Sequence, residues 1–236
     1  TYGRSHTAAR KSLAELKELK DAGLDRIHIG LETGYDPLLA YIEKGCTAKN
    51  HIEGGKKLKE AGISLCEYVM PGLGGKKTSQ EHARETAKVL NEIDPDYIRL
   101  RSLHITPAMP LWTKLQSGDF ELQTEDDVAR EIGVCIENLQ VTSYLTSDHT
   151  LNLLMEVEGK MPEDKEKCLN IINKYLSLSD EERLNFRFGK RAGLYNRLAD
   201  LSDSNKHDKI EQAIKHLRAQ GSHIEEVIFK LKDSFI

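Results

Sequence analysis

Polar residues that could bind a ligand or transfer a proton stand directly after four predicted strands. The groups are Glu32, Thr33 and Gly34, then residues 70–75, then His104, Thr106 and Pro107, and last Ser147, Asp148 and His149. In parallel α/β folds the carboxyl ends of the strands meet at one edge, and sites lie there. We therefore expect these groups to face one another. The stub Tyr2-Gly3-Arg4 reads as the end of a further strand and brings Arg4 to the same edge.

Each of these groups also has an ordinary structural interpretation. Glu32 could serve as an anion at the N-terminus of the next helix. The turn at 71–75 (PGLGG) lacks the GxxxxGK[ST] and GxGxxG patterns, so a flexible turn is favoured over a phosphate site. Asp148 and His149 fit a helix cap. No nucleophile elbow is present, so a hydrolase triad has little support, while an acid–base pair of Glu32 and His149 stays open.

The composition limits the class of protein. The chain has 236 residues, 39% hydrophobic and 31% charged, with a net charge of -4 and no apolar run long enough to span a bilayer. No basic face indicates a nucleic-acid partner. Four cysteines stand at positions 46, 66, 135 and 168, none within ligand spacing of another, so the chain holds neither a CxxC zinc site nor an iron–sulfur motif. Reduced thiols of this kind predict a cytoplasmic protein.

The elements that position these residues alternate between helix and strand in the first two thirds of the chain. Strands are predicted at 26–32, 63–70, 96–103 and 141–146, and helices at 11–22, 48–61, 79–93 and 125–139. Thr47 and Thr124 are predicted N-caps, and Thr78 with Glu81 fits a capping box. The strand centres recur about every 35 residues, the length of a βα unit with a right-handed crossover.

The strands predict which architecture these units build. Arg26, His28 and Glu32 alternate with isoleucines and Leu31 along the first strand, and Arg99 and Arg101 do so along the third. Charged side chains are rarely buried unpaired, so the polar face is predicted to line a concave interior while the apolar face packs on helices. A sheet with one face open to solvent is the alternative. The assignment of Glu67 to a face stays ambiguous.

The alternation of strands and helices ends after about residue 155. The stretch from 163 to 236 predicts several helices and no strand, with capping boxes at Ser179 and Ser222. We therefore predict an α/β fold, a partial (β/α) barrel with parallel strands over residues 1–155, followed by an all-helical region over residues 156–236.

Six strings in order resemble the radical S-adenosylmethionine (SAM) superfamily, above all its Fe–S oxidoreductases of the elongator-subunit, methylthiotransferase and coproporphyrinogen-dehydrogenase group. The strings are GLETG (30–34), YDPLLAYIEKGCT (35–47), KLKEAGI (57–63), YVMPGLGG (68–75), ETAKVLNEIDPDYIRLRSL (85–103) and TPAMPLW (106–112). The last departs from the usual PGTPLY, with Ala108 and Met109 in place of Gly and Thr. The likeness covers about residues 1–115 and is expected to continue to about residue 155.

This resemblance implies a cofactor and a reaction. Family members hold a 4Fe-4S cluster on a CxxxCxxC motif, cleave SAM reductively to a 5′-deoxyadenosyl radical and abstract hydrogen from substrate. It places eight residues of this chain beside SAM: Arg4, Glu32, Thr33, Gly34, Pro71, Gly72, Leu103 and His104. Arg4 would neutralise the carboxylate of SAM and Glu32 would contact its ribose or methionine part. Arg99, Arg101, Asp148 and His149 are the candidates on the substrate side.

The chain departs from the family in lacking CxxxCxxC. We therefore expect it to be the carboxyl-terminal fragment of a radical SAM enzyme, with no catalytic residue assigned, no metal site and no cofactor held tightly by the fragment alone. The alternative is a cluster-free module that binds a ligand or partner without catalysis. The substrate is unknown, no membrane partner is expected, and a barrel cut before its fourth strand leaves an unpaired edge that favours self-association over a cover made by the tail.

Overall fold

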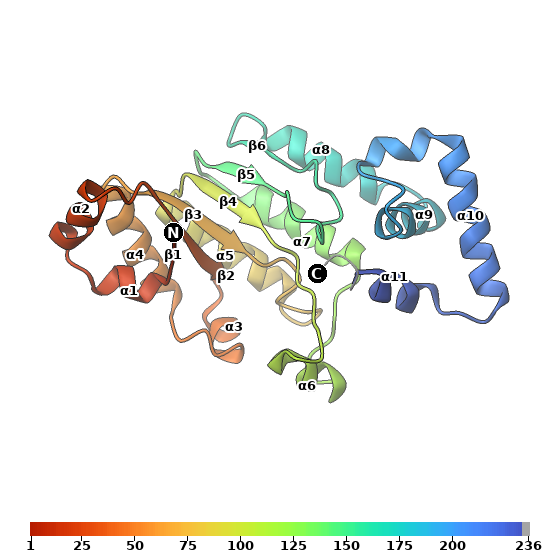
Figure 1. Cartoon of the computed structure of the whole chain (residues 1–236), viewed down its shortest axis with the longest axis horizontal. Helices are drawn as coiled ribbons and strands as arrows, with labels where there is room; N and C mark the ends of the chain where they lie inside the picture. The colour runs from red at the N-terminus through yellow and green to blue at the C-terminus, as the bar shows by residue number, and fades with distance from the viewer. Residues whose placement is uncertain (233–236) are drawn as a thin grey trace.

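Five parallel strands and one short antiparallel strand build the sheet of this protein, in a computed structural model that describes residues 1–232 (Figure 1). The strands lie side by side in sequence order, from β1 to β6. Each strand is thus added to the sheet on the same side of the strand before it, so the sheet is wound in one direction, as in a (β/α) barrel. In a doubly wound sheet the strand order reverses at one point. The predicted α/β fold of a partial barrel is confirmed.

The α/β part comprises the following elements: β1 (Tyr2–Gly3), α1 (Ser5–Arg10), α2 (Leu13–Asp21), β2 (Arg26–Glu32), α3 (Asp36–Tyr41), α4 (Ala48–Glu60), β3 (Ser64–Val69), α5 (Ser79–Ile93), β4 (Tyr97–Leu100), α6 (Pro110–Gln116), α7 (Glu125–Asn138), β5 (Tyr144–Thr146) and β6 (Gly159–Lys160). The carboxyl-terminal helices are α8 (Lys165–Leu176), α9 (Asp180–Arg191), the 3-10 helix η1 (Leu198–Ser202), α10 (Ser204–Ala219) and α11 (Ile224–Lys232). The strand β6 lies beyond the predicted domain boundary at residue 155, in a stretch for which no strand was predicted.

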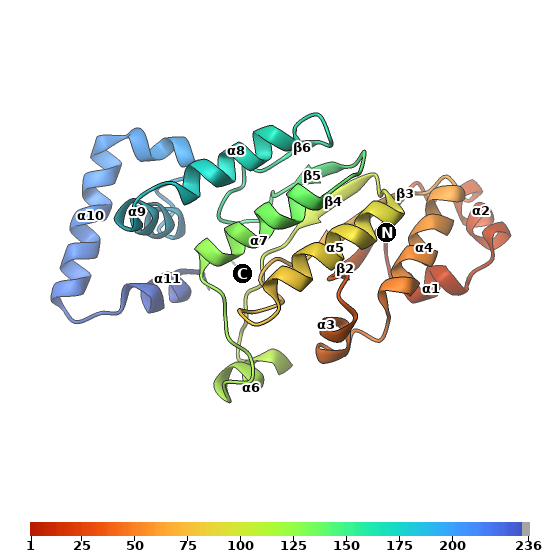
Figure 2. The same cartoon turned by 180° about the vertical axis from the view of Figure 1, so that it is seen from behind.

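One face of the sheet is covered by helices and the other is open. Figure 2 shows α4, α5, α7 and α8 in front of the strands, whereas Figure 1 shows the strands from the uncovered side. The apolar side chains of the strands, such as Ile29, Leu65, Ile98 and Leu145, are buried in the core on the helix side. The predicted alternation of an apolar and a polar face is confirmed.

Three of the predicted helix N-caps are confirmed. Thr47, Thr124 and Ser179 each accept a hydrogen bond from the backbone three residues on, and the side chain at that position returns a bond, so the first turn is satisfied. Two predicted capping boxes are wrong. The hydroxyl of Thr78 donates to the carbonyl of Gly74 at 2.8 Å instead, and α11 begins at Ile224, so Ser222 is not its cap.

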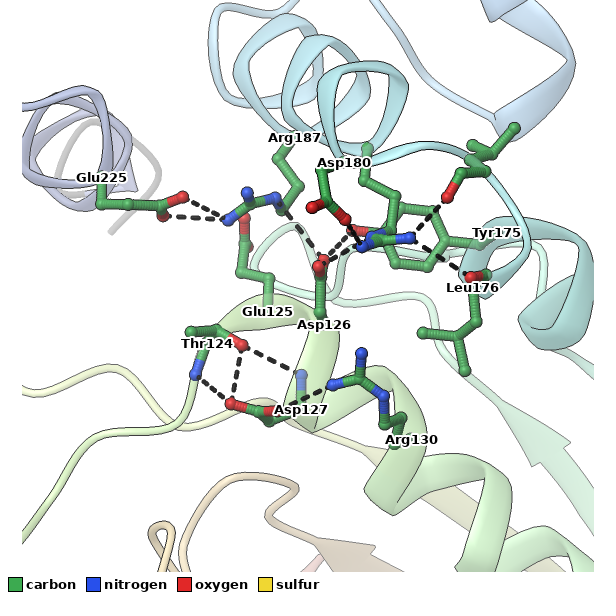
Figure 3. Close-up of polar contacts among 12 residues, drawn as sticks. Thr124, Glu125, Asp126, Asp127, Arg130, Tyr175, Leu176, Asp180, Arg187 and Glu225 are labelled. Carbon is green, nitrogen blue, oxygen red and sulfur yellow. Dashed lines mark hydrogen bonds and ion pairs between the residues drawn. The ribbon is translucent and has the colours of Figure 1, made fainter.

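The helical region packs at the β6 end of the sheet, away from β1, as both views show (Figures 1 and 2). Acidic residues in the first turn of α7 hold it there. Asp126 accepts from Arg183 Nε at 2.8 Å and from the hydroxyl of Tyr175, and it also pairs with Arg187 (Figure 3). The tail is therefore tied to the α/β part by buried charges.

A second buried ion pair lies beside the first. Glu125 pairs with the guanidinium of Arg191, which also donates to the carbonyls of Thr150 and Leu151, and with Lys232 Nζ at 3.0 Å. These contacts join α7, α9 and α11 to the loop after β5. No helix among the described residues is long and apolar enough to cross a membrane.

Candidate functional site

The carboxyl ends of β1 to β5 meet at one edge of the sheet, because these strands are parallel. Arg4 follows β1 at this edge and is exposed, while Glu32 ends β2, and the turn at 70–75 follows β3. Residues 101–104 follow β4, and Ser147, Asp148 and His149 follow β5. The structure therefore brings the predicted groups to one edge, as the sequence indicated.

Glu32 has an unusual backbone at this edge. Its φ of 60° lies in the left-handed region, which a non-glycine residue adopts only when its surroundings enforce it, and the register of β2 against β3 shifts at this point. The carboxylate consequently folds back over Gly30, where a Cβ atom would lie 2.2 Å from Glu32 Oε1. Lys44 Nζ donates to the same oxygen at 2.9 Å. Gly30 is thus required for the position that Glu32 takes.

Thr33 and Gly34 lie behind the edge and connect it to α5. The Thr33 hydroxyl contacts His82 Nδ1 at 2.8 Å, and the Gly34 N–H donates to the Thr86 hydroxyl at 2.9 Å. A Cβ on Gly34 would lie 2.4 Å from the carbonyl oxygen of Glu85, so only glycine permits this close approach. Both residues fix the loop after β2, and contact with a cofactor stays a prediction for them.

His82 joins the loops after β2 and β3. Its Nε2 lies 3.1 Å from the carbonyl of Met70, which can only accept, so Nε2 carries the proton and Nδ1 accepts from Thr33. Burial lowers the pKa of His82 below its usual range, which favours this neutral form. The imidazole therefore acts as a fixed bridge between two strand ends.

Glu131 on α7 holds the turn after β3. Its carboxylate accepts from the Gly72 N–H at 2.7 Å and from the Ser79 hydroxyl at 2.7 Å, and it lies 3.4 Å from His82 Nε2. Gln123 in turn donates to Ser79 at 2.8 Å. The sequence did not identify His82 on α5 or Glu131 on α7 as site residues, because Glu131 contacts partners more than fifty positions away in the sequence.

A cavity that is open to solvent at its mouth lies beside Gly72, Leu103 and His104. The Leu103 N–H donates to the carbonyl of Pro71 at 2.8 Å, which joins the two loops, and the His104 ring lies 5.4 Å from the ring of Phe229 on α11. The cavity walls are mainly aliphatic. Two buried acceptors that line it, Gln123 Oε1 and Glu125 Oε2, have no hydrogen-bond donor among the described residues.

The open face of the sheet carries rings and cations. Tyr2, His28 and Tyr68 from three neighbouring strands form a cluster with centroids 5.3 to 6.3 Å apart. The Arg101 guanidinium lies 5.0 Å from the centre of the Tyr68 ring, and that of Arg99 lies 5.7 Å from it. Both arginines therefore project to the open side, as predicted. Tyr68, which is part of this cluster, was not predicted.

The substrate-side candidates are not equivalent. Arg99 makes a bidentate ion pair with Asp148, which lies after β5, so its charge is balanced. No carboxylate of residues 1–232 pairs with Arg101 or with Arg26, whose guanidinium lies 4.1 Å from the centre of the Tyr97 ring. Burial, together with nearby positive charges, lowers the pKa of His28 and also that of His149. The open face is therefore cationic.

Glu67 lies on the opposite, helix-covered face. It is fully buried between Leu65 and Val69 along β3, and neither carboxylate oxygen has a hydrogen-bond partner among the described residues. Burial raises the pKa of Glu67 well above its usual range, and the negative charge of Glu32 adds to the effect. The ambiguity that the sequence left for this strand is thereby resolved, with Ser64, Cys66 and Tyr68 on the open side.

The cysteines do not form a ligand set for an iron–sulfur cluster. Cys46 precedes α4, Cys66 lies on β3, Cys135 on α7 and Cys168 on α8, and all four are free. Burial raises the pKa of the last three to about 11 or 12, which disfavours the thiolate that binds metal. Among the described residues, the group with three possible metal ligands close together is the outward-facing trio of His207, Asp208 and Glu211 on α10.

Comparison with known families agrees with the predicted resemblance. Residues 5–89 match the model of the Radical SAM superfamily. The protein YtqA of Bacillus subtilis is 25% identical over 164 residues, which cover 68% of this chain and 50% of YtqA. A biotin synthase of Hydrogenobaculum sp. is 34% identical over 105 residues, 44% of this chain and 30% of its own. The resemblance to the radical SAM superfamily is confirmed.

A solved structure shows the same fold. The archaeal Methanocaldococcus infernus Elp3 with an N-terminal deletion superposes with a TM-score of 0.53 and 18% identity, over 73% of this chain and 41% of that one. A tRNA uridine(34) acetyltransferase of Methanocaldococcus jannaschii is 22% identical over 116 residues, 48% of this chain and 21% of its own. The chain spans half or less of the length of these relatives.

Proposed function

We propose that the chain is the carboxyl-terminal part of a radical SAM Fe–S oxidoreductase and contributes one wall of its SAM site. The parent enzyme would cleave SAM reductively to a 5′-deoxyadenosyl radical and abstract hydrogen from a substrate not yet identified. The observation that carries the proposal is the joint placement of Glu32, the 71–75 turn and Leu103 at one strand edge, in a chain whose residues 5–89 match the superfamily.

The residues at this edge suit the two ends of SAM. Glu32 offers a carboxylate beside Lys44, and Arg4 is exposed at the neighbouring strand end, so hydroxyl, ammonium and carboxylate groups of SAM all find partners. The cavity beside Gly72, Leu103 and His104 has mainly aliphatic walls and holds two acceptors for which the described part of the chain supplies no donor. An adenine ring supplies both a flat apolar surface and an amino donor, which supports placing it there.

The iron–sulfur cluster does not fit residues of this chain. The four cysteines lie on separate elements, three of them buried with raised pKa values. The cluster of the proposed enzyme therefore requires ligands from outside this sequence. The chain alone is expected to hold SAM only weakly.

The test starts with the gene upstream of Thr1. If the proposal holds, that region encodes CxxxCxxC, and the extended protein, reconstituted anaerobically with iron and sulfide, forms 5′-deoxyadenosine from SAM under dithionite. Glu32→Gln in that protein should raise the KM for SAM, whereas Glu53→Gln, on the exposed part of α4 beside Lys49, should leave it unchanged. An upstream region without the motif, together with no 5′-deoxyadenosine, would instead establish the cluster-free binding module.

Two further expectations belong to this proposal. We propose that the chain self-associates through the edge at β1, because the helical region packs at the opposite end of the sheet and leaves that edge uncovered. Sedimentation at micromolar concentration should then show a dimer or larger species, and a monomer would reject the idea. We also propose a cytoplasmic location, since four free thiols suit a reducing compartment.

A further inference from the structure

The open face of the sheet has a charge and a ring arrangement that the SAM site does not use. Its cations, Arg26, Arg99 and Arg101, come from β2 and from β4 and its extension, because the Arg101 N–H still donates to the carbonyl of Val69. Asp148 neutralises the charge of Arg99 and pairs with neither of the other two arginines. The face consequently keeps two positive charges, on Arg26 and Arg101, that no carboxylate of residues 1–232 neutralises.

The rings on this face give it a second property. Tyr2 and His28 each stack with Tyr68, at interplanar angles of 16° and 26°, and the rings of Tyr2 and His28 are tilted by 36° to each other. Tyr2 is 76% exposed, so one ring plane of the cluster is free for contact. Burial and the surrounding cations lower the pKa of His28, which keeps its ring neutral. A neutral aromatic cluster beside unpaired guanidinium groups matches a ligand that has a flat ring and an anionic group.

We infer that this face binds a planar small molecule carrying a phosphate or carboxylate, with the ring on the Tyr2–His28–Tyr68 cluster and the anion on Arg101. Arg101 is the anchor because Arg99 is already bidentate to Asp148, and because Arg26 lies at the amino end of β2, where it donates to the Ser64 hydroxyl and lies against Tyr97. If this face is the substrate side of the enzyme, the inference rests on the proposed function. As a ligand-binding face it can be tested without SAM.

Uridine 5′-monophosphate is a suitable probe, because it carries a pyrimidine and not the adenine ring of SAM. Its binding is therefore distinguishable from binding at the proposed adenine site. Its binding to the wild-type chain is measured by equilibrium dialysis, with uridine and inorganic phosphate measured separately as half-ligands. We expect the nucleotide to bind at least about tenfold more tightly than either half, since charge-assisted bonds and stacking both contribute. Binding should weaken as salt is raised, because partly exposed charges are screened.

Three variants locate the site. Arg101→Gln should weaken nucleotide binding about tenfold, Arg101→Lys should recover part of the loss, and Tyr68→Leu should remove the preference over phosphate. Arg130→Gln on α7, whose partner Asp127 lies on the far side of the sheet, is the matched control and should change nothing. Circular dichroism melts of all variants show whether each one is folded.

The outcomes separate this inference from the proposed function. Equal affinities of the Arg101→Gln and Arg130→Gln variants overturn the inference, and so does uridine binding as tightly as its monophosphate. Phosphate binding as tightly as the nucleotide overturns the role of the rings. Nucleotide binding that depends on Arg101 supports the inference even if the extended protein fails to cleave SAM, in which case only the proposed reaction falls.

Discussion

Two regions of this protein use arginine in opposite ways. At the junction of α7 with the helical region, Arg183 and Arg187 are largely buried and pair with Asp126, whose contact with Arg187 is drawn in Figure 3. Arg191 is also buried there and pairs with Glu125. On the open face of the sheet, Arg101 contacts a ring and no carboxylate of the described residues. Removal of a buried, paired charge leaves its partner uncompensated, whereas an unpaired charge at a wet surface contributes little to folding.

The two regions show which charges build the fold and which are available to a ligand. The junction charges face one another across elements far apart in sequence, so their role is structural. Arg99 and Arg101 lie over the Tyr68 ring, on the face of the sheet opposite to the helices. The comparison therefore predicts large losses of stability at the junction and small ones on the face.

The largest effect is expected for Arg191→Ala. The side chain of Arg191 is 1% exposed, and its loss leaves the carbonyls of Thr150 and Leu151 without this donor and leaves Lys232 as the cation paired with buried Glu125. We expect the free energy of unfolding to fall by about 3–5 kcal/mol. Urea denaturation measures the change. Arg218→Ala, which removes an exposed pair with Glu181, is the control and should have little effect; similar losses in both variants would contradict the comparison.

A smaller loss is expected when the bridge behind the strand edge is broken. Glu131→Ala leaves the Gly72 N–H and the Ser79 hydroxyl without their acceptor in a buried site. The free energy of unfolding should fall by roughly 1–3 kcal/mol, and hydrogen exchange at the 71–75 turn should quicken more than in the core of α5. Unchanged exchange at Gly72 would show that Glu131 does not hold the turn.

Glu67 is a buried group with no hydrogen-bond partner within residues 1–232, so it should respond to pH in a way that the paired carboxylates do not. Its folded pKa is raised, so the protonated form favours the folded state, and stability from this group is lost as pH rises from the unfolded pKa toward the folded one. The slope is at most about 1.4 kcal/mol per pH unit. Urea denaturation at pH 5, 6 and 7 should show Glu67→Gln gaining on the wild type as pH rises, and parallel curves would show that Glu67 is ionised.

The sequence predicted the strands well because their patterns are local. Arg26–Glu32 appears in the structure with its predicted bounds, since alternation of polar and apolar residues is sufficient to define both strand and face. The same reasoning placed Glu32 and Arg101 at the edge and on the open side. Thr47 and Thr124 were predictable caps for a similar reason, since a cap and its partner lie three residues apart.

The parts of the fold and of the site that could not be predicted depend on contacts between residues far apart in the sequence. Glu131 bonds a turn on another element, and Asp126 meets Arg183 only after the helical region has packed, so neither role leaves a local pattern. Thr78 had the spacing of a capping box, but its hydroxyl bonds Gly74 because the turn before α5 is tightly folded. The left-handed backbone of Glu32 was likewise not predictable, since it lies where the register of β2 against β3 shifts, and register is set by pairing between distant residues.

The smallest effect on stability is expected for Arg101→Gln, the variant that also tests the ligand. Arg101 has no acidic partner in the described part of the chain, and its contact with the Tyr68 ring at 5.0 Å is partly solvated. Such a contact contributes no more than about 0.5–1 kcal/mol, so the urea midpoint should shift little. The variant should therefore fold normally while it loses nucleotide binding, and a loss of stability as large as that of Arg191→Ala would make Arg101 a structural residue and remove the contrast between the two regions.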